Sequence, residues 1–187
     1  MLEFRVVPMP GPAADEVRVR ELAASVTSGD SRMRTARFPL SMGLIARPFL
    51  GFRGPRQSIL GTEIAAIVDA VGAGVTRYRP GDAVMAFPGG KMGCHAEYSC
   101  VAVSGRITLK PEGLSFAEAA TLSFGGSTAL HFLDVAAVAP GDRVLIVGAS
   151  GGVGAALVQL ACHRGAHVTA VCSVHNAIWC AAWGHRR

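Results

Sequence analysis

The sequence Val144-Leu-Ile-Val-Gly-Ala-Ser-Gly-Gly-Val-Gly154 is an apolar run that ends in a glycine-rich turn. Within it, Ala149-x-Gly151-x-x-Gly154 has the spacing of the dinucleotide-binding fingerprint, with alanine in place of the first glycine. Gly151 would let a diphosphate approach the backbone, and Gly154 would let a helix pack against the strand. Unpaired amides at the start of that helix favour negative charge. The pattern predicts a cofactor site made by Ala149, Ser150, Gly151, Gly152, Val153 and Gly154. A purely structural turn is the alternative.

The residues on either side of this turn complete one βαβ unit. We expect a strand over 143–148, a helix over 152–164 that ends at Gly165, and a second strand over 167–172. An acid at the end of the second strand would hold the ribose of NAD, whereas this chain has Ser173, which can donate to a 2′-phosphate. NADPH is therefore expected in preference to NADH. Ser173 could equally be an ordinary serine at a strand end.

Short strands are expected in the N-terminal part of the chain. Alternating or continuous apolar residues predict strands over Val17–Ala24, Ile64–Val71 and Ala83–Phe87. The motif Pro-Gly-Asp occurs at Pro80–Asp82 and again at Pro140–Asp142, each time just before an apolar run. Both are predicted to be β-turns that precede strands.

The pattern changes from strands to helices near Pro111. Ser115-Phe-Ala-Glu118 is a capping box, and helical spacing follows through Ala120, resumes after Gly125-Gly126 and runs to about Val138. We therefore predict an α/β protein with a β domain over 1–125, followed by the incomplete start of a parallel α/β domain over 126–187.

Composition and charge narrow the class of protein. The chain has 187 residues, of which 50% are hydrophobic and 17% are charged, so it is expected to form a globular core. Its five scattered cysteines favour a reduced, cytoplasmic setting. The acid-free, arginine-rich stretch Arg32–Arg56 could face phosphates or a membrane, but a solvated loop is the simpler interpretation. The charge-free stretch Val144–Cys162 is interrupted by glycines, so we interpret it as strand, turn and helix and not as a membrane span.

Taken together, these segments resemble the medium-chain dehydrogenase/reductase superfamily, in its zinc-independent, quinone-oxidoreductase-like branch. Further matching segments, in order along the chain, are Ala24–Arg34, Leu60–Glu63, Gly81–Val84, His95–Tyr98, Ala119–Leu122 and Thr128–Leu130. The resemblance implies a GroES-like β domain for the substrate, followed by a Rossmann domain for the nicotinamide cofactor, with the active site in the cleft between them.

The resemblance also implies the candidate site residues and the absence of zinc. The catalytic candidates in this chain are Thr27, Asp30 and Tyr98. Thr27 and Asp30 fall on the segment that faces the nicotinamide in this family, and Thr128, a cofactor-binding candidate, falls on the segment that supports it. Tyr98 could donate a proton, although a buried strand tyrosine is the simpler role. Zinc-dependent members carry a cysteine where this chain has Thr27 and a histidine where it has Thr62, so we expect no metal.

Both ends depart from the family pattern, and we expect the chain to be an incomplete copy. The expected first strand is missing, and after Asn176-Ala177 the sequence Ile-Trp-Cys-Ala-Ala-Trp-Gly184 replaces the family's helix. Codons for these residues, read one base earlier, can encode Asp-Leu-Val-Arg-Ser-Leu-Gly-Ala. Residues from about Ile178 onward are therefore expected to be out of frame, and a divergent natural tail is the alternative.

The expected function is that of an oxidoreductase. It would transfer a hydride from NADPH to an activated alkene, a quinone or a carbonyl, without zinc. The alternative is a non-catalytic fragment or pseudo-enzyme remnant of such a reductase. The expected partner is a small-molecule substrate, with a homodimer as one assembly to consider. Neither nucleic acid nor membrane is expected as a partner.

Overall fold

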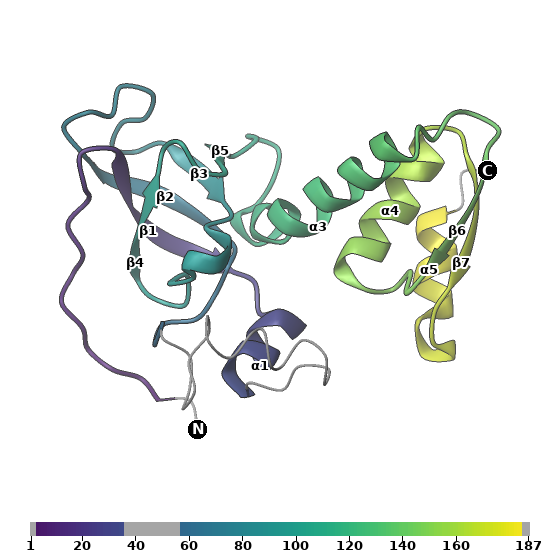
Figure 1. The fold of residues 1–187 in the computed structure, drawn as a ribbon, viewed down its shortest axis with the longest axis horizontal. Coiled ribbons are helices and arrows are strands. Elements are labelled where there is room, and N and C mark those ends of the chain that lie inside the picture. Colours follow the sequence, from purple (N-terminus) through teal and green to yellow (C-terminus); the bar gives the residue numbers. More distant parts are fainter. Residues whose placement is uncertain (1–2, 36–56, 185–187) are drawn as a thin grey trace. The chain divides into compact units, whose positions relative to one another are not determined.

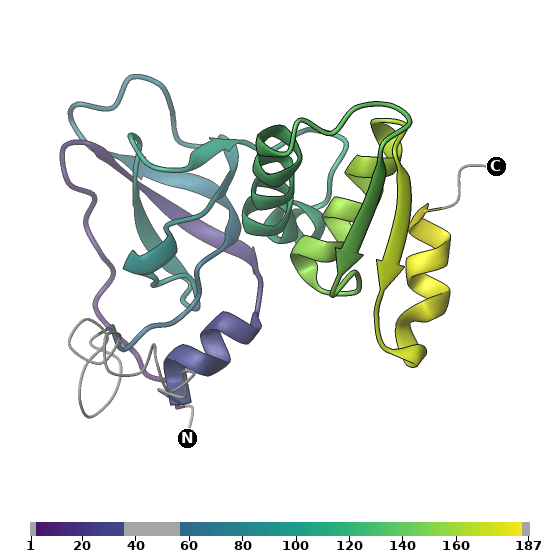
Figure 2. The same ribbon diagram turned by 45° about the vertical axis from the view of Figure 1, so that its right-hand side comes forward.

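The computed structural model describes residues 3–35 and 57–184. The chain divides into two compact units, Met1–Ala120 and Thr121–Arg187, and helix α3 (Phe116–Val135) runs across the division (Figures 1 and 2). Most of the arginine-rich stretch Arg32–Arg56 lies outside the described residues, so the two interpretations of that stretch stay untested. No helix in the described part of the chain is long and apolar enough to cross a membrane.

The N-terminal unit is built on one antiparallel sheet of five strands in the order β4-β1-β2-β3-β5. Two of its strands, β1 (Glu16–Ala24) and β2 (Ile64–Val71), form the long central pair, and the predictions for both are confirmed. The remaining strands are β3 (Ala83–Ala86), β4 (Tyr98–Ala102) and β5 (Ile107–Leu109), and two short helices, α1 (Ser28–Thr35) and η1 (Gly89–Lys91), lie in the connections.

The core of this unit follows from the period-two alternation along β1. Val17 and Val19 are fully buried, and they pack with Ile64, Val68 and Val84 in one cluster. Each such side chain contributes roughly 1.5–3 kcal/mol when it leaves water. The register of β1 against β2 shifts at two places, between Arg18 and Val19 and between Glu21 and Ala23. Such irregularities bend and twist a strand, which lets the sheet curl around this core.

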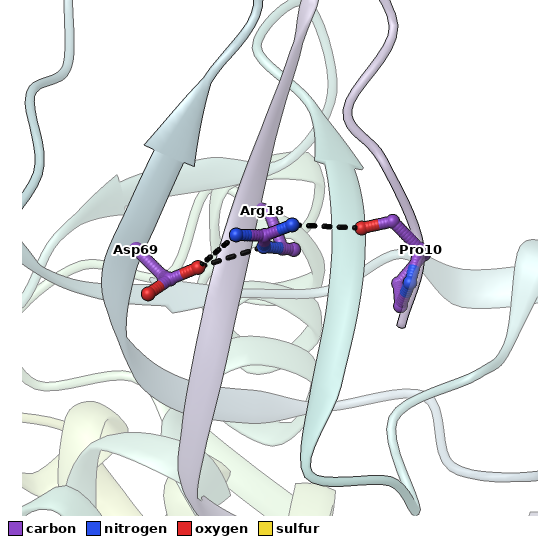
Figure 3. A network of polar contacts seen from close by, with 3 residues as sticks. All are labelled: Pro10, Arg18 and Asp69. Carbon is purple, nitrogen blue, oxygen red and sulfur yellow. Dashed lines mark hydrogen bonds and ion pairs between the residues drawn. The ribbon is translucent and has the colours of Figure 1, made fainter. Parts of the chain in front are cut away.

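The opposite face of β1 carries an arginine that joins three segments of the chain. The Nε of Arg18 donates to Asp69 Oδ2 on β2 at 2.7 Å, and its Nη1 donates to the carbonyl of Pro10 at 3.3 Å (Figure 3). The guanidinium also lies 5.9 Å from the centre of the Tyr98 ring on β4. This network ties the N-terminal segment to the outside of the sheet.

Both Pro-Gly-Asp motifs form the same turn, as predicted. Gly81 and Gly141 have φ of 95° and 88°, a conformation that glycine adopts without strain. In the first turn the carboxylate of Asp82 accepts from the amide of Arg79 at 3.0 Å, and in the second Asp142 accepts from Ala139 at 2.9 Å. The aspartate closes each turn because its short side chain reaches back three residues.

Helix α3 begins where the sequence predicts and continues where it was expected to break. Ser115 and Glu118 make the reciprocal bonds of a capping box, with Ser115 N donating to Glu118 at 2.8 Å and Glu118 N donating to the Ser115 hydroxyl at 3.2 Å. The expected interruption at Gly125-Gly126 is wrong, since α3 is continuous through it and ends at Val135. A Cβ on Gly125 would lie 3.0 Å from the carbonyl oxygen of Gly152. Gly125 therefore lets α3 pack closely against the backbone at Gly152.

The C-terminal unit contains the predicted βαβ arrangement. Strands β6 (Arg143–Val147) and β7 (His167–Val171) are parallel, and helix α4 (Gly152–His163) connects them. The short helix η2 (Val174–Asn176) and helix α5 (Ala177–Gly184) follow. Cys180 of α5 is buried in the same core as Leu133, Ile146, Val158 and Ala161.

Candidate functional site

The glycine turn between β6 and α4 is held by backbone contacts. The amides of Gly148 and Ala149 both donate to the carbonyl of Val171 at the end of β7, at 2.9 and 3.0 Å. A Cβ on Gly154 would lie 2.2 Å from the carbonyl oxygen of Gly148 and 2.8 Å from the Cα of Ala149. No side chain fits there, so the helix lies directly on the turn, which is the packing role predicted for Gly154.

The first turn of α4 has no side-chain cap among the residues that the structure describes. Its N-cap is Gly151, which is extended and offers no side-chain hydrogen bond. The first amides of an α-helix have no partner within the helix, so those of Gly152, Val153 and Gly154 need one from outside. A Cβ on Gly152 would meet nothing within 4 Å, which leaves space beside these donors. This arrangement suits the diphosphate of a dinucleotide, since both the amides and the helix dipole favour an anion.

Three polar side chains surround the edge of this turn. Asn176 Nδ2 donates to the hydroxyl of Ser150 in the glycine turn and to the hydroxyl of Ser173 after β7, both at 3.1 Å. The structure therefore brings two of the predicted cofactor residues, Ser150 and Ser173, to one amide. Asn176 was not predicted as a site residue; its position three residues after Ser173 was the available signal.

The predicted catalytic pair Thr27 and Asp30 forms a second cluster, in the N-terminal unit. The amide and the hydroxyl of Thr27 both donate to Asp30 Oδ2 at 2.7 Å, and the amide of Asp30 donates to the Thr27 hydroxyl at 3.3 Å. These bonds are a capping box at the start of α1. The second carboxylate oxygen of Asp30 accepts from the amide of Gly61 at 3.2 Å. Asp30, which is 4% exposed, thus joins α1 to the loop before β2.

A glutamate and a histidine extend this cluster. Glu63 is 3% exposed and accepts from the hydroxyl of Ser25 at 2.9 Å. His95 Nε2 lies 3.0 Å from the carbonyl oxygen of Ser25, and its amide donates to Leu60. A Cβ on Gly61 would lie 2.5 Å from the ring of His95, so these segments touch closely. The polar side chains of this cluster are held by hydrogen bonds to one another and to the backbone.

Comparison with known proteins identifies the family. Residues 13–133 match the family described as alcohol dehydrogenase GroES-like domain. The chain belongs to this family. It is thereby a member of the medium-chain dehydrogenase/reductase superfamily, and both the predicted family and its fold, a GroES-like unit followed by the start of a Rossmann domain, are confirmed.

The relatives of this GroES-like chain include quinone oxidoreductases. A chloroplast envelope quinone oxidoreductase homolog of Arabidopsis thaliana is 37% identical over 94% of the chain and 52% of the relative. The quinone oxidoreductase of Coxiella burnetii matches with a TM-score of 0.80 and 32% identity, over 96% of this chain and 55% of that one. The Escherichia coli quinone oxidoreductase complexed with NADPH matches with a TM-score of 0.78 and 25% identity, over 98% and 51%. The chain thus spans about half the length of these relatives.

Two further predicted residues, Tyr98 and Thr128, lie on β4 and on α3. Tyr98 pairs with Arg20 across β1 and β4, so it shares the outer face of the sheet with Arg18 and is half-buried beneath that guanidinium. Within the described residues, the side-chain hydrogen bonds of Thr27 and Asp30 go to each other and to Gly61, and none goes to Tyr98. Thr128 is half-buried in the middle of α3. The roles predicted for Tyr98 and Thr128 stay predictions.

The GroES-like unit also contains a half-buried acid, Glu21, whose carboxylate oxygens are buried and which was not among the predicted site residues. Glu21 follows Val17 and Val19 on the inward face of β1, and neither of its carboxylate oxygens has a hydrogen-bond partner of normal geometry among the described residues. Burial raises its pKa to about 8, although the Ser99 hydroxyl and the Ala96 amide lie close enough to oppose this shift. The signal was available, because an acid at the third inward position of an apolar strand breaks the alternation.

Close to these acids lies the buried thiol of Cys94. Burial raises its pKa above the usual range, and the negative charges of Glu21, Asp30 and Glu63 add to this effect. At neutral pH the side chain is therefore a neutral thiol. Among the described residues no group of three or more histidine, cysteine or acidic side chains is arranged to hold a metal ion. The expected absence of zinc stays a prediction.

The Thr27–Asp30 capping box leads to a stability prediction. Asp30→Ala is expected to destabilise the N-terminal unit by about 2–3 kcal/mol, since it removes a helix cap and leaves the buried amide of Gly61 unpaired. Urea unfolding followed by circular dichroism would measure this change. Thr27→Ser, which keeps the hydroxyl, should remain within about 0.5 kcal/mol of the unmodified chain. Equal stability of all three proteins would show that these bonds contribute nothing to the fold.

Proposed function

We propose that this chain binds NADPH at the turn Gly148–Gly154 and serves in zinc-independent hydride transfer to an activated alkene, a quinone or a carbonyl. The observation that carries the proposal is the start of α4, where no side chain of the described residues caps the first amides and the space at Gly152 is open. The similarity to an Escherichia coli quinone oxidoreductase that is described as complexed with NADPH supports it.

Each part of the cofactor site has a role in the proposal. The amides of Gly152, Val153 and Gly154 would hold the diphosphate, and the Ser173 hydroxyl would donate to the 2′-phosphate. Ala149 is buried beneath the turn, and Gly151 N donates to Gly148 O at 3.0 Å, so these residues shape the turn. NADPH would supply the hydride, and Thr128 would support the nicotinamide.

The roles of Thr27 and Asp30 follow from their hydrogen bonds. The Thr27 hydroxyl already donates to Asp30, and both oxygens of Asp30 accept bonds from the backbone. We therefore propose that Asp30 positions Thr27 and the first turn of α1 on the substrate side, and that neither residue transfers a proton. Zinc independence is supported by Thr27 and Thr62, which occupy the positions where zinc-dependent members have cysteine and histidine.

A second candidate function is a non-catalytic remnant of such a reductase. In the described part of the chain, the sheet of β6 and β7 leaves Leu145 and Val147 65% and 75% exposed. Parallel sheets normally have both faces covered. If this face is also uncovered in solution, the glycine turn has less packing to hold it rigid, and nucleotide binding should be weaker.

Thermal unfolding with and without nucleotide separates the two candidates. If the site is competent, NADPH at one hundred times its dissociation constant should stabilise the chain by about 2.7 kcal/mol and raise its melting temperature by several degrees. Adenosine, which lacks the diphosphate, is the control ligand and should produce no shift. An unchanged melting temperature in millimolar NADPH would contradict the proposed function and favour the non-catalytic remnant.

A further inference from the structure

The amide of Asn176 connects the two serine hydroxyls at the rim of the glycine turn. Ser150 belongs to the turn before α4, and Ser173 follows β7, twenty-three positions further along the sequence. Asn176 itself is held by its backbone, since its amide N donates to the carbonyl of Ser173 at 2.9 Å. Asn176 is half-buried and Ser173 is exposed, so the amide lies behind a hydroxyl that faces solvent.

The chemistry of the amide group decides what these hydroxyls can do. The NH₂ of asparagine carries two donors and no acceptor, so both serines must accept from it. Each hydroxyl keeps its own O–H, which points away from the incoming donor and is free to donate elsewhere. The result is a pair of O–H donors at the edge of the turn, near the first amides of α4.

A pair of fixed donors favours one of the two nicotinamide cofactors. A phosphate monoester offers only acceptor oxygens and negative charge, so it matches outward O–H groups and forms charge-assisted bonds. The free 2′-hydroxyl of NADH carries no charge, and it is better matched by a carboxylate, which accepts its proton. The residues from Val171 to Asn176 include no acid, so no carboxylate is available there to accept from a 2′-hydroxyl.

We propose that Asn176 is a positioning residue that makes this site selective for 2′-phosphorylated nucleotides, by orienting the hydroxyls of Ser150 and Ser173 as donors. This inference rests on the proposed function, because it concerns the cofactor that the glycine turn would hold. It assigns the selectivity to a residue that need not touch the phosphate.

The test compares nucleotide pairs that differ only in the 2′-phosphate. Dissociation constants of the whole chain for NADPH and NADH, and for adenosine 2′,5′-bisphosphate and 5′-AMP, can be measured by calorimetry. Asn176→Asp turns the donor into an acceptor and adds negative charge, so the NADPH-to-NADH preference should fall by about tenfold or more, with NADH binding nearly unchanged. Asn176→Ala should lower the preference by a smaller factor, because the hydroxyls then rotate freely.

A merely structural role for Asn176 would weaken both members of each pair equally, and that outcome would overturn the inference. If the unmodified chain bound neither NADPH nor NADH, the proposed function itself would fail, which is a distinct result. Should Asn176→Asp fail to fold, Ser173→Ala provides an independent route. It should reduce the same preference, and adding Asn176→Ala to it should reduce the preference little further. Fully additive losses would contradict the coupling of the two residues.

Discussion

Gly154→Ala is expected to disrupt the C-terminal unit and abolish nucleotide binding. The added Cβ would lie 2.2 Å from the carbonyl oxygen of Gly148 and 2.8 Å from the Cα of Ala149. Both neighbours are backbone atoms of a turn that β7 holds through Val171, so neither can move without breaking those bonds. Overpacking against fixed atoms costs about 3 kcal/mol or more. Urea unfolding and binding of NADPH would measure the two effects.

Gly152→Ala is the matched control for this experiment, two residues away in the same turn. A Cβ there would meet nothing within 4 Å, and alanine favours the helix over glycine by roughly 0.5–1 kcal/mol. The variant should therefore fold at least as well as the unmodified chain. It should still bind NADPH more weakly, because the methyl group would stand in the space proposed for the diphosphate. If Gly154→Ala unfolded at the same urea concentration as Gly152→Ala, the close packing of α4 on the turn would be refuted.

The half-buried acid Glu21 should make the stability of the chain depend on pH. Its pKa is about 8 in the folded chain and 4.5 when exposed. Below pH 4.5 the carboxyl is neutral in both the folded and the unfolded chain, so it does not reduce the free energy of unfolding. As pH rises from 4.5 to about 8, the unfolded chain ionises and the folded chain does not, so the free energy of unfolding falls. Because the side chain is only partly shielded from water, we expect the free energy of unfolding to fall by about 2 kcal/mol over this range of pH.

Glu21→Gln should remove this pH dependence, since glutamine has the same shape and does not ionise. The variant should be more stable than the unmodified chain by about 2 kcal/mol at pH 8 and nearly equal to it at pH 4.5. Urea unfolding at a series of pH values gives the difference curve, which isolates Glu21 from the other acids. The exposed Glu97→Gln, which also removes one carboxylate, serves as the control. Parallel curves for the unmodified chain and Glu21→Gln would mean that Glu21 is ionised and solvated in the folded state.

Local signals in the sequence predicted the strands, turns and helix starts. The Pro-Gly-Asp turns and the Ser115–Glu118 capping box each depend on atoms within three residues, so a short stretch of sequence contains everything that forms them. The long strands β1 and β2 follow from apolar residues that must leave water. The βαβ unit around the glycine turn was predictable for the same reason.

The sequence by itself determined the order of the elements, the family and the place of the proposed cofactor turn. Only the tertiary structure decided the roles of three residues whose partners are distant in sequence. Gly125 lies within a continuous helix because the backbone at Gly152 packs against it, and Asp30 joins α1 to Gly61. Asn176 reaches back to Ser150 across a helix and a strand. The physical reason is that a hydrogen bond or a close contact depends on which groups the folded chain brings together, and spacing along the sequence does not contain that information.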